Sequence, residues 1–380
     1  MASTRIRSKK VRFCTVTRFL SIICAIVCSA TAVLAGGDDV HVMRRVDTAH
    51  PQVRRVLNQW VDSLAQWSIP TSWYGMHLVR PTTQSVVRDW FYHESARPTV
   101  LSVDFDGNGY AVRTLFTTHV AGSSTEQPLG TLRCRFTLVA SGSSWIIEDA
   151  LETTTRHWDT TRVGIVTLIH APIHIVDSQE VEASVELLRQ TAERFSLATP
   201  SHVHCYVVDS RDDICQMLGI DYYAYPPSAI SYPRDGIVLQ SNDASLRHEL
   251  MHILFSQYAQ THPVLREGIA TLLGGTGVLD VDQAVDQYIR ERDDQSTPSF
   301  VQLFTSSRVE QADVYVLGAV LCDAVLRSGG SVALFEVLQL SRPSDVMYRI
   351  ASVLDLDISD RQESMYSFVV RQSRRTLQHR

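Results

Sequence analysis

The chain has 380 residues, of which 44% are hydrophobic and 20% are charged, and its formal net charge is −6. This length indicates two or three compact units, and the composition excludes a wholly disordered or fibrous chain. Beyond Arg18 the chain contains no lysine and has more acidic than basic residues. The acidic balance argues against nucleic acid as a partner.

The N-terminus has the pattern of a targeting segment. Basic residues between Arg5 and Arg18 precede an apolar run from Phe19 to Leu34, in which Val33 and Ala35 form a small-residue cleavage pair. This pattern predicts a secretory signal peptide over residues 1–35 and therefore an extracytoplasmic protein, secreted or periplasmic. The alternative is an uncleaved membrane anchor, since the run is near the lower limit of about 17 residues for crossing a bilayer. No later run is expected to span a membrane.

Four cysteines follow the leader: Cys134, Cys205, Cys215 and Cys322. Export would permit disulfides, and Cys205 and Cys215 are the pair expected to be closest in space. The other interpretation is that all four are small buried hydrophobic residues. Since the chain has no CxxC motif, a zinc site made of thiolates is not indicated.

The pattern of apolar and polar residues over 48–156 predicts a first α+β unit. Gln52 to Trp67 has the apolar spacing of a helix, and two hairpins of alternating apolar and polar residues follow it. The first hairpin is expected to use an Asn-Gly turn within residues 106–109, and the second ends in a strand from Trp145 to Ile147. A helix followed by long hairpins resembles the cone-shaped fold of SnoaL-like and nuclear-transport-factor-like domains, which implies no activity.

The pattern changes at Val163 and predicts a second unit over residues 163–275 and a helical part over 276–380, so that the fold class is α+β. Short strands and helices are expected first. They are a strand region at Val163 to Val176, a helix at Val181 to Phe195, a strand at His202 to Val208, a helix at Asp212 to Leu218, a loop at Tyr222 to Pro227 and a strand at Gly236 to Gln240. Only helices are expected afterwards, namely Pro263 to Leu273, Val281 to Arg290, Ala312 to Arg327, Val332 to Leu338 and two more.

The segment His248-Glu249-Leu250-Met251-His252 carries the chemistry. Asn242 or Asp243 can cap a helix that starts at about Ala244. Histidines four residues apart then project from one helix face, as two ligands of a tetrahedral zinc ion require. Glu249 would lie beside the metal without binding it and act as the general base.

A third ligand follows in the next predicted helix, from Pro263 to the glycines at 274 and 275. If the motif helix ends near Tyr258, it extends about 9 Å beyond His252, and a returning helix descends about 6 Å by Glu267. Glu267 can therefore reach the metal. Two imidazoles and one carboxylate would leave the fourth position open for water, which is the catalytic arrangement.

HELMH followed by LREGIATLL resembles the gluzincin zinc metallopeptidases, in particular the peptidase-MA-like group, over roughly residues 163–380. The resemblance implies a zincin-like catalytic core at 163–275 and zinc held by His248, His252 and Glu267, with Glu249 as general base. It also implies that Gly236 to Gln240 is an edge strand along which an extended peptide substrate lies.

The chain departs from the thermolysin type at two points. Thr271 stands where those enzymes place an aspartate that orients a histidine, so another group must support the ligands. The family also donates a Tyr or His hydrogen bond to the oxyanion, and Tyr315 is the candidate for this second catalytic role. Its other interpretation is a helix-packing aromatic. Tyr232 and His262 are further alternatives, and His262 is also an alternative third metal ligand.

Residues Asp104 to Gly109 match the opening of a calcium-binding EF-hand loop, but Leu115 occupies the twelfth position and strands flank the segment, which favours a hairpin turn. The sequence thus predicts a zinc peptidase with no further cofactor, acting on a peptide or protein substrate. The alternative is an inactive extracytoplasmic binding or scaffold protein that kept the fold. Complete zinc ligands together with Glu249 favour the enzyme.

Overall fold

The computed structural model describes residues 31–33, 40–67, 82–91, 96–119, 125–138, 145–172, 177–242, 244–306, 309–356 and 365–378. The predicted signal peptide lies outside these residues except for Thr31–Val33, which forms strand β1. Whether the leader is cleaved therefore stays a prediction. The described residues contain both helices and strands, which agrees with the α+β class.

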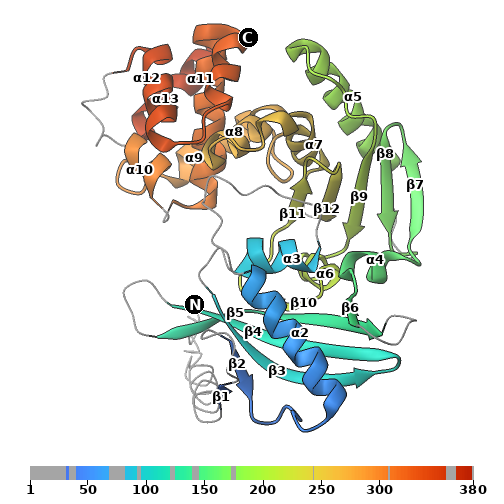
Figure 1. Cartoon of the computed structure of the whole chain (residues 1–380). Helices are drawn as coiled ribbons and strands as arrows, with labels where there is room; N and C mark the ends of the chain where they lie inside the picture. The colour runs from blue at the N-terminus through green and yellow to red at the C-terminus, as the bar shows by residue number, and fades with distance from the viewer. Residues whose placement is uncertain are drawn as a thin grey trace, which may run out of the picture.

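The first unit is a mixed sheet covered by one long helix (Figure 1). Its strands run in the order β1-β2-β3-β4-β5-β10, and β6 also pairs with β5. Helix α2 buries Trp60 fully against the sheet, where the indole nitrogen donates a hydrogen bond of 2.8 Å to the Thr114 hydroxyl. The elements are β1 (Thr31–Val33), β2 (His41–Met43), α2 (Pro51–Trp67), α3 (Thr83–Val86), the π-helix η2 (Val87–Phe91), β3 (Arg97–Asp106), β4 (Gly109–His119), β5 (Glu126–Leu138), β6 (Trp145–Ile147) and α4 (Ala150–Thr155).

The β3–β4 hairpin turns on a different residue pair from the one expected. Asp106 pairs with Gly109, so the two central residues are Gly107 and Asn108, and Gly107 has φ +64°. Glycine at the first central position is typical of a type II′ turn, so the Asn-Gly prediction is wrong in register. The hairpin itself is confirmed, and Arg135 donates to Asn108 Oδ1 at 3.0 Å, as suits a turn rather than a calcium loop.

A five-stranded sheet forms the centre of the second unit, in the order β11-β12-β9-β8-β7. Strands β12, β9 and β8 are parallel, and the two outer strands are antiparallel to their neighbours. The elements are β7 (Asp159–Val163), β8 (Val166–His170), α5 (Ser178–Phe195), β9 (Val203–Val208), α6 (Arg211–Met217), β10 (Ile220–Tyr223), β11 (Ala229–Tyr232), β12 (Ile237–Ser241), α7 (Leu246–Leu254), the 3₁₀ helix η4 (Ser256–Tyr258) and α8 (Pro263–Gly274).

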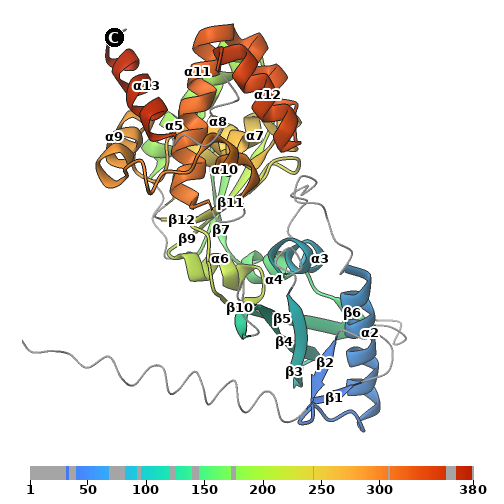
Figure 2. The same cartoon turned by 90° about the vertical axis from the view of Figure 1, so that its left-hand side faces the viewer.

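Both faces of this sheet are buried, each in a different core. Side chains alternate along a strand, so Val238 of β12 joins the core that also contains α5, α7 and the C-terminal helices, whereas Leu239 joins the core of the first unit. Figure 2 shows the first sheet below, the five-stranded sheet in the middle and the C-terminal helices above. β10 pairs with β5, so the chain returns to the first sheet after the second has begun.

The two-core arrangement also shows whether Cys205 and Cys215 are close in space. Cys205 lies in the core shared with the C-terminal helices and Cys215 in that of the first unit. The expected proximity of this pair is therefore wrong, because the sheet separates the two thiols. Both are free and buried, as are Cys134 and Cys322. Burial raises the pKa of Cys215 to about 12.

The C-terminal part is helical as predicted, with α9 (Val281–Glu291), α10 (Phe300–Thr305), α11 (Gln311–Leu338), α12 (Pro343–Leu354) and α13 (Tyr366–Gln378). The two expected helices within α11 form one element kinked at Gly330, and α10 was not expected. In the described part of the chain α11 is long and apolar enough to cross a membrane, contrary to expectation, but 56% of that stretch is buried inside the protein.

Three other predicted elements need correction. The strand region predicted at Val163 to Val176 contains β8 and only the last residue of β7, an antiparallel neighbour that begins earlier, at Asp159, and residues 173–176 lie outside the described residues. The loop predicted from Tyr222 begins instead within strand β10. β12 is not the edge strand, because β11 pairs along its outer side. The missed strand β11 contains only four residues, too few for a clear alternation.

Candidate metal centre

Helix α7 brings the two motif histidines together. It follows β12 and begins at Leu246 rather than Ala244, with Ser245 as N-cap and no side-chain capping bond; Asn242 instead donates to Asp209, and Asp243 lies outside the described residues. The Nε2 atoms of His248 and His252 lie 3.2 Å apart. Both residues are buried, with exposed fractions of 6% and 8%.

Glu267 reaches this pair from α8. Its Oε2 atom lies 3.4 Å from Nε2 of His248 and 3.1 Å from Nε2 of His252. The motif helix ends at Leu254 and not near Tyr258, where a 3₁₀ turn follows it, whereas the returning helix begins at Pro263 and ends at Gly274 as predicted. Arg266 donates to the other carboxylate oxygen, Oε1, at 3.2 Å, which orients Oε2 toward the histidines.

The end of α8 orients the first histidine. The Nδ1 atom of His248 lies 2.8 Å from the carbonyl oxygen of Gly275, so this nitrogen donates and Nε2 is turned toward the other two side chains. A side chain at Gly274 would meet the Arg247 carbonyl at 2.7 Å, so the helices approach this closely only because glycine stands there. The Gly275 carbonyl thus orients His248 by a hydrogen bond. The buried Thr271 hydroxyl does not take this role, because it has no hydrogen-bond partner among the described residues.

These three side chains fit a zinc ion. Tetrahedral zinc binds nitrogen and oxygen at about 2.0–2.2 Å, which places neighbouring ligand atoms about 3.4 Å apart. The three separations in the cluster are 3.1, 3.2 and 3.4 Å. Two imidazole nitrogens and a carboxylate oxygen this close together in a buried place need a proton or a metal cation between them. His248, His252 and Glu267 are therefore a group that can bind a metal.

The neighbouring charges shift the pKa values of two of these residues. Burial lowers the pKa of His248, but its hydrogen bond to Glu267 and the charge of Glu249 outweigh this and raise the pKa to about 9. Burial raises the pKa of Glu267, yet the neighbouring histidines and Arg266 hold it well below its usual value. The cluster thus favours positive charge beside an ionised carboxylate.

Glu249 and Tyr315 lie at the same centre. Glu249 is buried, with an exposed fraction of 8%. Burial, and then the charges of Glu267 and Glu249, raise the pKa of Tyr315, so its hydroxyl stays protonated. The Tyr315 ring centroid is 5.5 Å from that of His248. Tyr315 is therefore a neighbour of the proposed ligands as well as a helix-packing residue.

The two alternatives to these residues are wrong. His262 caps the start of α8: its Nδ1 accepts from the Val264 backbone and its Nε2 lies 3.1 Å from the Phe304 carbonyl oxygen. Burial lowers its pKa to about 4, and it is not part of the cluster. Tyr232 is almost fully buried in the core of the first unit, on the opposite face of the sheet.

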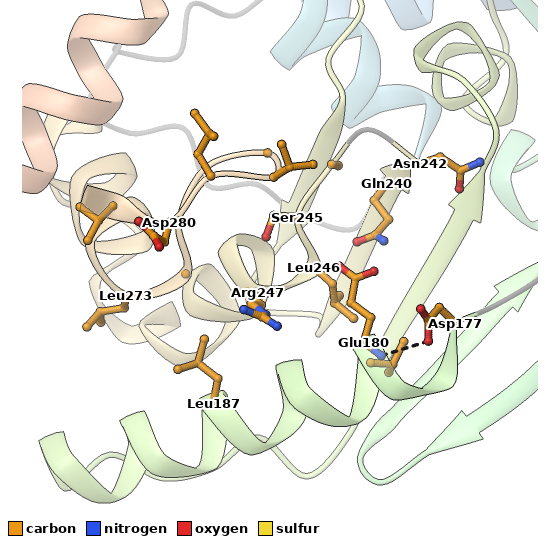
Figure 3. A pocket seen from close by; sticks show the side chains of 18 of the residues that line it. Asp177, Glu180, Leu187, Gln240, Asn242, Ser245, Leu246, Arg247, Leu273 and Asp280 are labelled. Atoms are coloured by element: carbon orange, nitrogen blue, oxygen red, sulfur yellow. Dashed lines mark hydrogen bonds between the residues drawn. The ribbon is translucent and has the colours of Figure 1, made fainter. Parts of the chain in front are cut away.

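A cavity of about 710 Å³ lies at the start of α7 (Figure 3). Its lining includes Asp177, the N-cap of α5, together with Glu180 of α5, Gln240 of β12 and Arg247. Gly275, whose carbonyl orients His248, also lines it. None of the three candidate ligands lines this cavity. It is therefore separate from the place where the chemistry would occur.

No protein-family model matches the chain, and no curated protein matches it. Two similar solved structures are of a variant two-domain M1 zinc metallopeptidase, one bound to L-tryptophan and one to L-arginine. Each is 14% identical and matches over 73% of this chain, with TM-scores of 0.32 and 0.30. This chain covers 64% and 63% of their lengths, less than two thirds, and the TM-scores are too low to establish a common fold.

Proposed function

We propose that this chain is a zinc-dependent peptidase of the gluzincin type. One observation carries the proposal: two imidazole nitrogens and a carboxylate oxygen from two helices converge within 4.8 Å in a buried place. His248, His252 and Glu267 would hold the ion. Three protein ligands leave a fourth position for a reactant, which distinguishes a catalytic zinc site from a structural one.

The surrounding residues would divide the reaction between them. Zinc, when bound, supplies Lewis-acid chemistry by making water more acidic and polarising a carbonyl group. Glu249 accepts the proton of the attacking water and later gives it to the leaving amine. Tyr315 stays protonated and donates a hydrogen bond to the carbonyl oxygen as this oxygen gains negative charge.

The substrate peptide would lie along β11, not along the Gly236 to Gln240 strand that the family resemblance implied. β11 has one side paired with β12 and is the outer strand of the described sheet. Ile230 and Tyr232 face the core of the first unit, so by alternation Ala229 and Ser231 lie on the face that carries α7. An extended peptide could add to this edge through backbone hydrogen bonds.

The basic and apolar leader supports export, so we place the enzyme outside the cytoplasm. Membrane contact would arise through an uncleaved leader. Peptides or proteins are the expected substrates, and the acidic composition disfavours nucleic acid.

Glu249→Gln tests the mechanism because it removes the base but none of the proposed ligands. We expect one zinc ion per chain in both wild type and variant, and a loss of hydrolysis of at least about 100-fold in the variant. Peptide-library digestion followed by mass spectrometry, with metal analysis of the same samples, measures both. Unchanged hydrolysis would disprove the role of Glu249. A zinc-loaded wild type that cleaves nothing would favour the inactive binding protein.

A further inference from the structure

We propose that Gln311 is a positioning residue that holds the Tyr315 hydroxyl so that its hydrogen is available to the substrate carbonyl oxygen. This inference rests on the proposed peptidase function and adds a residue to it. Gln311 is exposed at the start of α11 and would not be selected from the sequence, because a polar residue there is unremarkable for a solvated helix end.

The contact has a defined polarity. The Gln311 side-chain nitrogen Nε2 donates to the Tyr315 Oη atom at 2.8 Å, one helical turn away. A phenol oxygen that accepts from the amide still has its own hydrogen to donate. Because the amide occupies one lone pair, the O–H bond cannot rotate toward that side. The interaction therefore turns the phenol into a donor aimed away from Gln311.

The start of α11, which carries both residues, is fixed to α9. The Tyr288 hydroxyl donates to Asp313 Oδ1 at 2.7 Å, and Asp313 is buried with an exposed fraction of 3%. Arg292 lies 3.9 Å from the same carboxylate oxygen and also pairs with Glu310. These contacts restrain the helix start, so that a single side-chain bond from Gln311 can set the direction of the phenol.

A glycine contact sets the distance of α11 from α8. A side chain at Gly318 would meet the Val264 carbonyl oxygen at 2.2 Å, and one at Gly268 would meet the Gly318 carbonyl carbon at 2.3 Å. The helix backbones thus touch one residue after Glu267 and about one turn after Tyr315. This contact brings the phenol to the centre, where its ring lies beside His248.

Two substitutions separate positioning from a structural role. Gln311→Ala removes the donor, and Gln311→Glu keeps the shape but replaces the donor with an acceptor that would draw the phenol hydrogen to itself. Glutamate in the first turn suits the helix dipole, so this variant should fold. We expect kcat to fall about five-fold in Gln311→Ala and further in Gln311→Glu, with KM and zinc content nearly unchanged.

The double variants give the decisive result. Tyr315→Phe should lower kcat about 100-fold, and either Gln311 change should then have no further effect. Gln287→Ala is the matched control, because Gln287 donates to Glu291 one turn ahead on the exposed side of α9 at 2.8 Å. This control should leave kcat unchanged. Equal losses from the Gln311 changes with and without the Tyr315 hydroxyl would overturn the inference.

A readout independent of hydrolysis checks the contact itself. In protein with ¹³Cζ-labelled tyrosine, the signal lost in Tyr315→Phe identifies Tyr315, and we expect Gln311→Ala to shift it and Gln287→Ala to leave it in place. An unshifted signal overturns the inference even if the protein is a peptidase. A shifted signal in a zinc-loaded wild type that hydrolyses no peptide would overturn the catalytic role together with the proposed function.

Discussion

Charged groups are arranged in opposite ways in the first sheet and at the candidate metal centre. On the first sheet, cations pair with anions at the surface: Arg133 lies 2.9 Å from Asp106 and Arg113 lies 3.0 Å from Asp221. At the centre, the electron-rich atoms of His248, His252 and Glu267 face each other in a buried place. The sheet pairs its charges with its own residues, whereas the zinc ion that we propose would complete the centre.

Removing the metal should have the largest effect on stability. A ligand that binds only the folded state at 1,000 times its Kd stabilises that state by about 4 kcal/mol. We therefore expect a chelator to lower the thermal midpoint of the wild type markedly and to have little effect on His252→Ala, measured by calorimetry at fixed zinc. Equal midpoints with and without zinc would mean that the centre, like the sheet, is satisfied by its own residues.

The next largest expected effect on stability is the pH dependence that buried His262 causes. Its pKa is lowered to about 4 in the folded protein, whereas the ordinary pKa of histidine is about 6.5. Between pH 6.5 and pH 4, His262 is therefore protonated in the unfolded chain but not in the folded protein. Stability must then fall as pH falls through this window. Relative to His262→Asn, the free energy of unfolding of the wild type should drop by about 3 kcal/mol between pH 7 and 4.

Denaturant unfolding of both proteins at several pH values measures this difference. Asparagine is a suitable replacement because it can also cap α8. Parallel pH curves for the two proteins would show that folding leaves the pKa of His262 unchanged, contrary to the expectation from its burial.

Two glycines test whether close packing matters only at the centre. A side chain at Gly318 would meet the Val264 carbonyl oxygen at 2.2 Å, and one at Gly109 in the β3–β4 hairpin would meet the Phe136 carbonyl oxygen at 2.2 Å. Each change to alanine should cost about 2 kcal/mol of stability. Hydrolysis by the folded protein should fall in Gly318→Ala and persist in Gly109→Ala, measured per folded molecule. Equal activity losses would contradict the distinction between the two regions.

Several parts of this structure were accessible from sequence because local pattern determines them. The amphipathic spacing predicts α2 and α5 to within three residues, and the spacing within His248 to His252 puts both rings on one helix face. The third proposed ligand, Glu267, was predicted from the rise of the two helices that the short loop connects. The end of the motif helix was predicted four residues too late, at Tyr258 instead of Leu254, but the start of the returning helix at Pro263 was predicted correctly.

The remaining features depend on contacts between distant segments, which a single sequence does not encode locally. β10 joins the sheet of the first unit, and β11 covers the strand predicted to be an edge. Cys205 and Cys215 are ten residues apart but lie in different cores. The Gly275 carbonyl that orients His248 is a backbone group, so no side chain in the sequence could have indicated it.

The smallest expected effect belongs to the exposed arginine pairs of the first sheet. The Arg133 and Asp106 side chains have exposed fractions of 44% and 38%. Water and salt screen such a pair, so it contributes about 0.2–1 kcal/mol. Arg133→Ala should therefore lower the free energy of unfolding by less than about 1 kcal/mol, and less still at high salt, with zinc content unchanged. A loss as large as that caused by the chelator would mean that the surface pairs are as essential as the buried cluster, and arrangement of charge would then no longer distinguish the metal centre from the sheet.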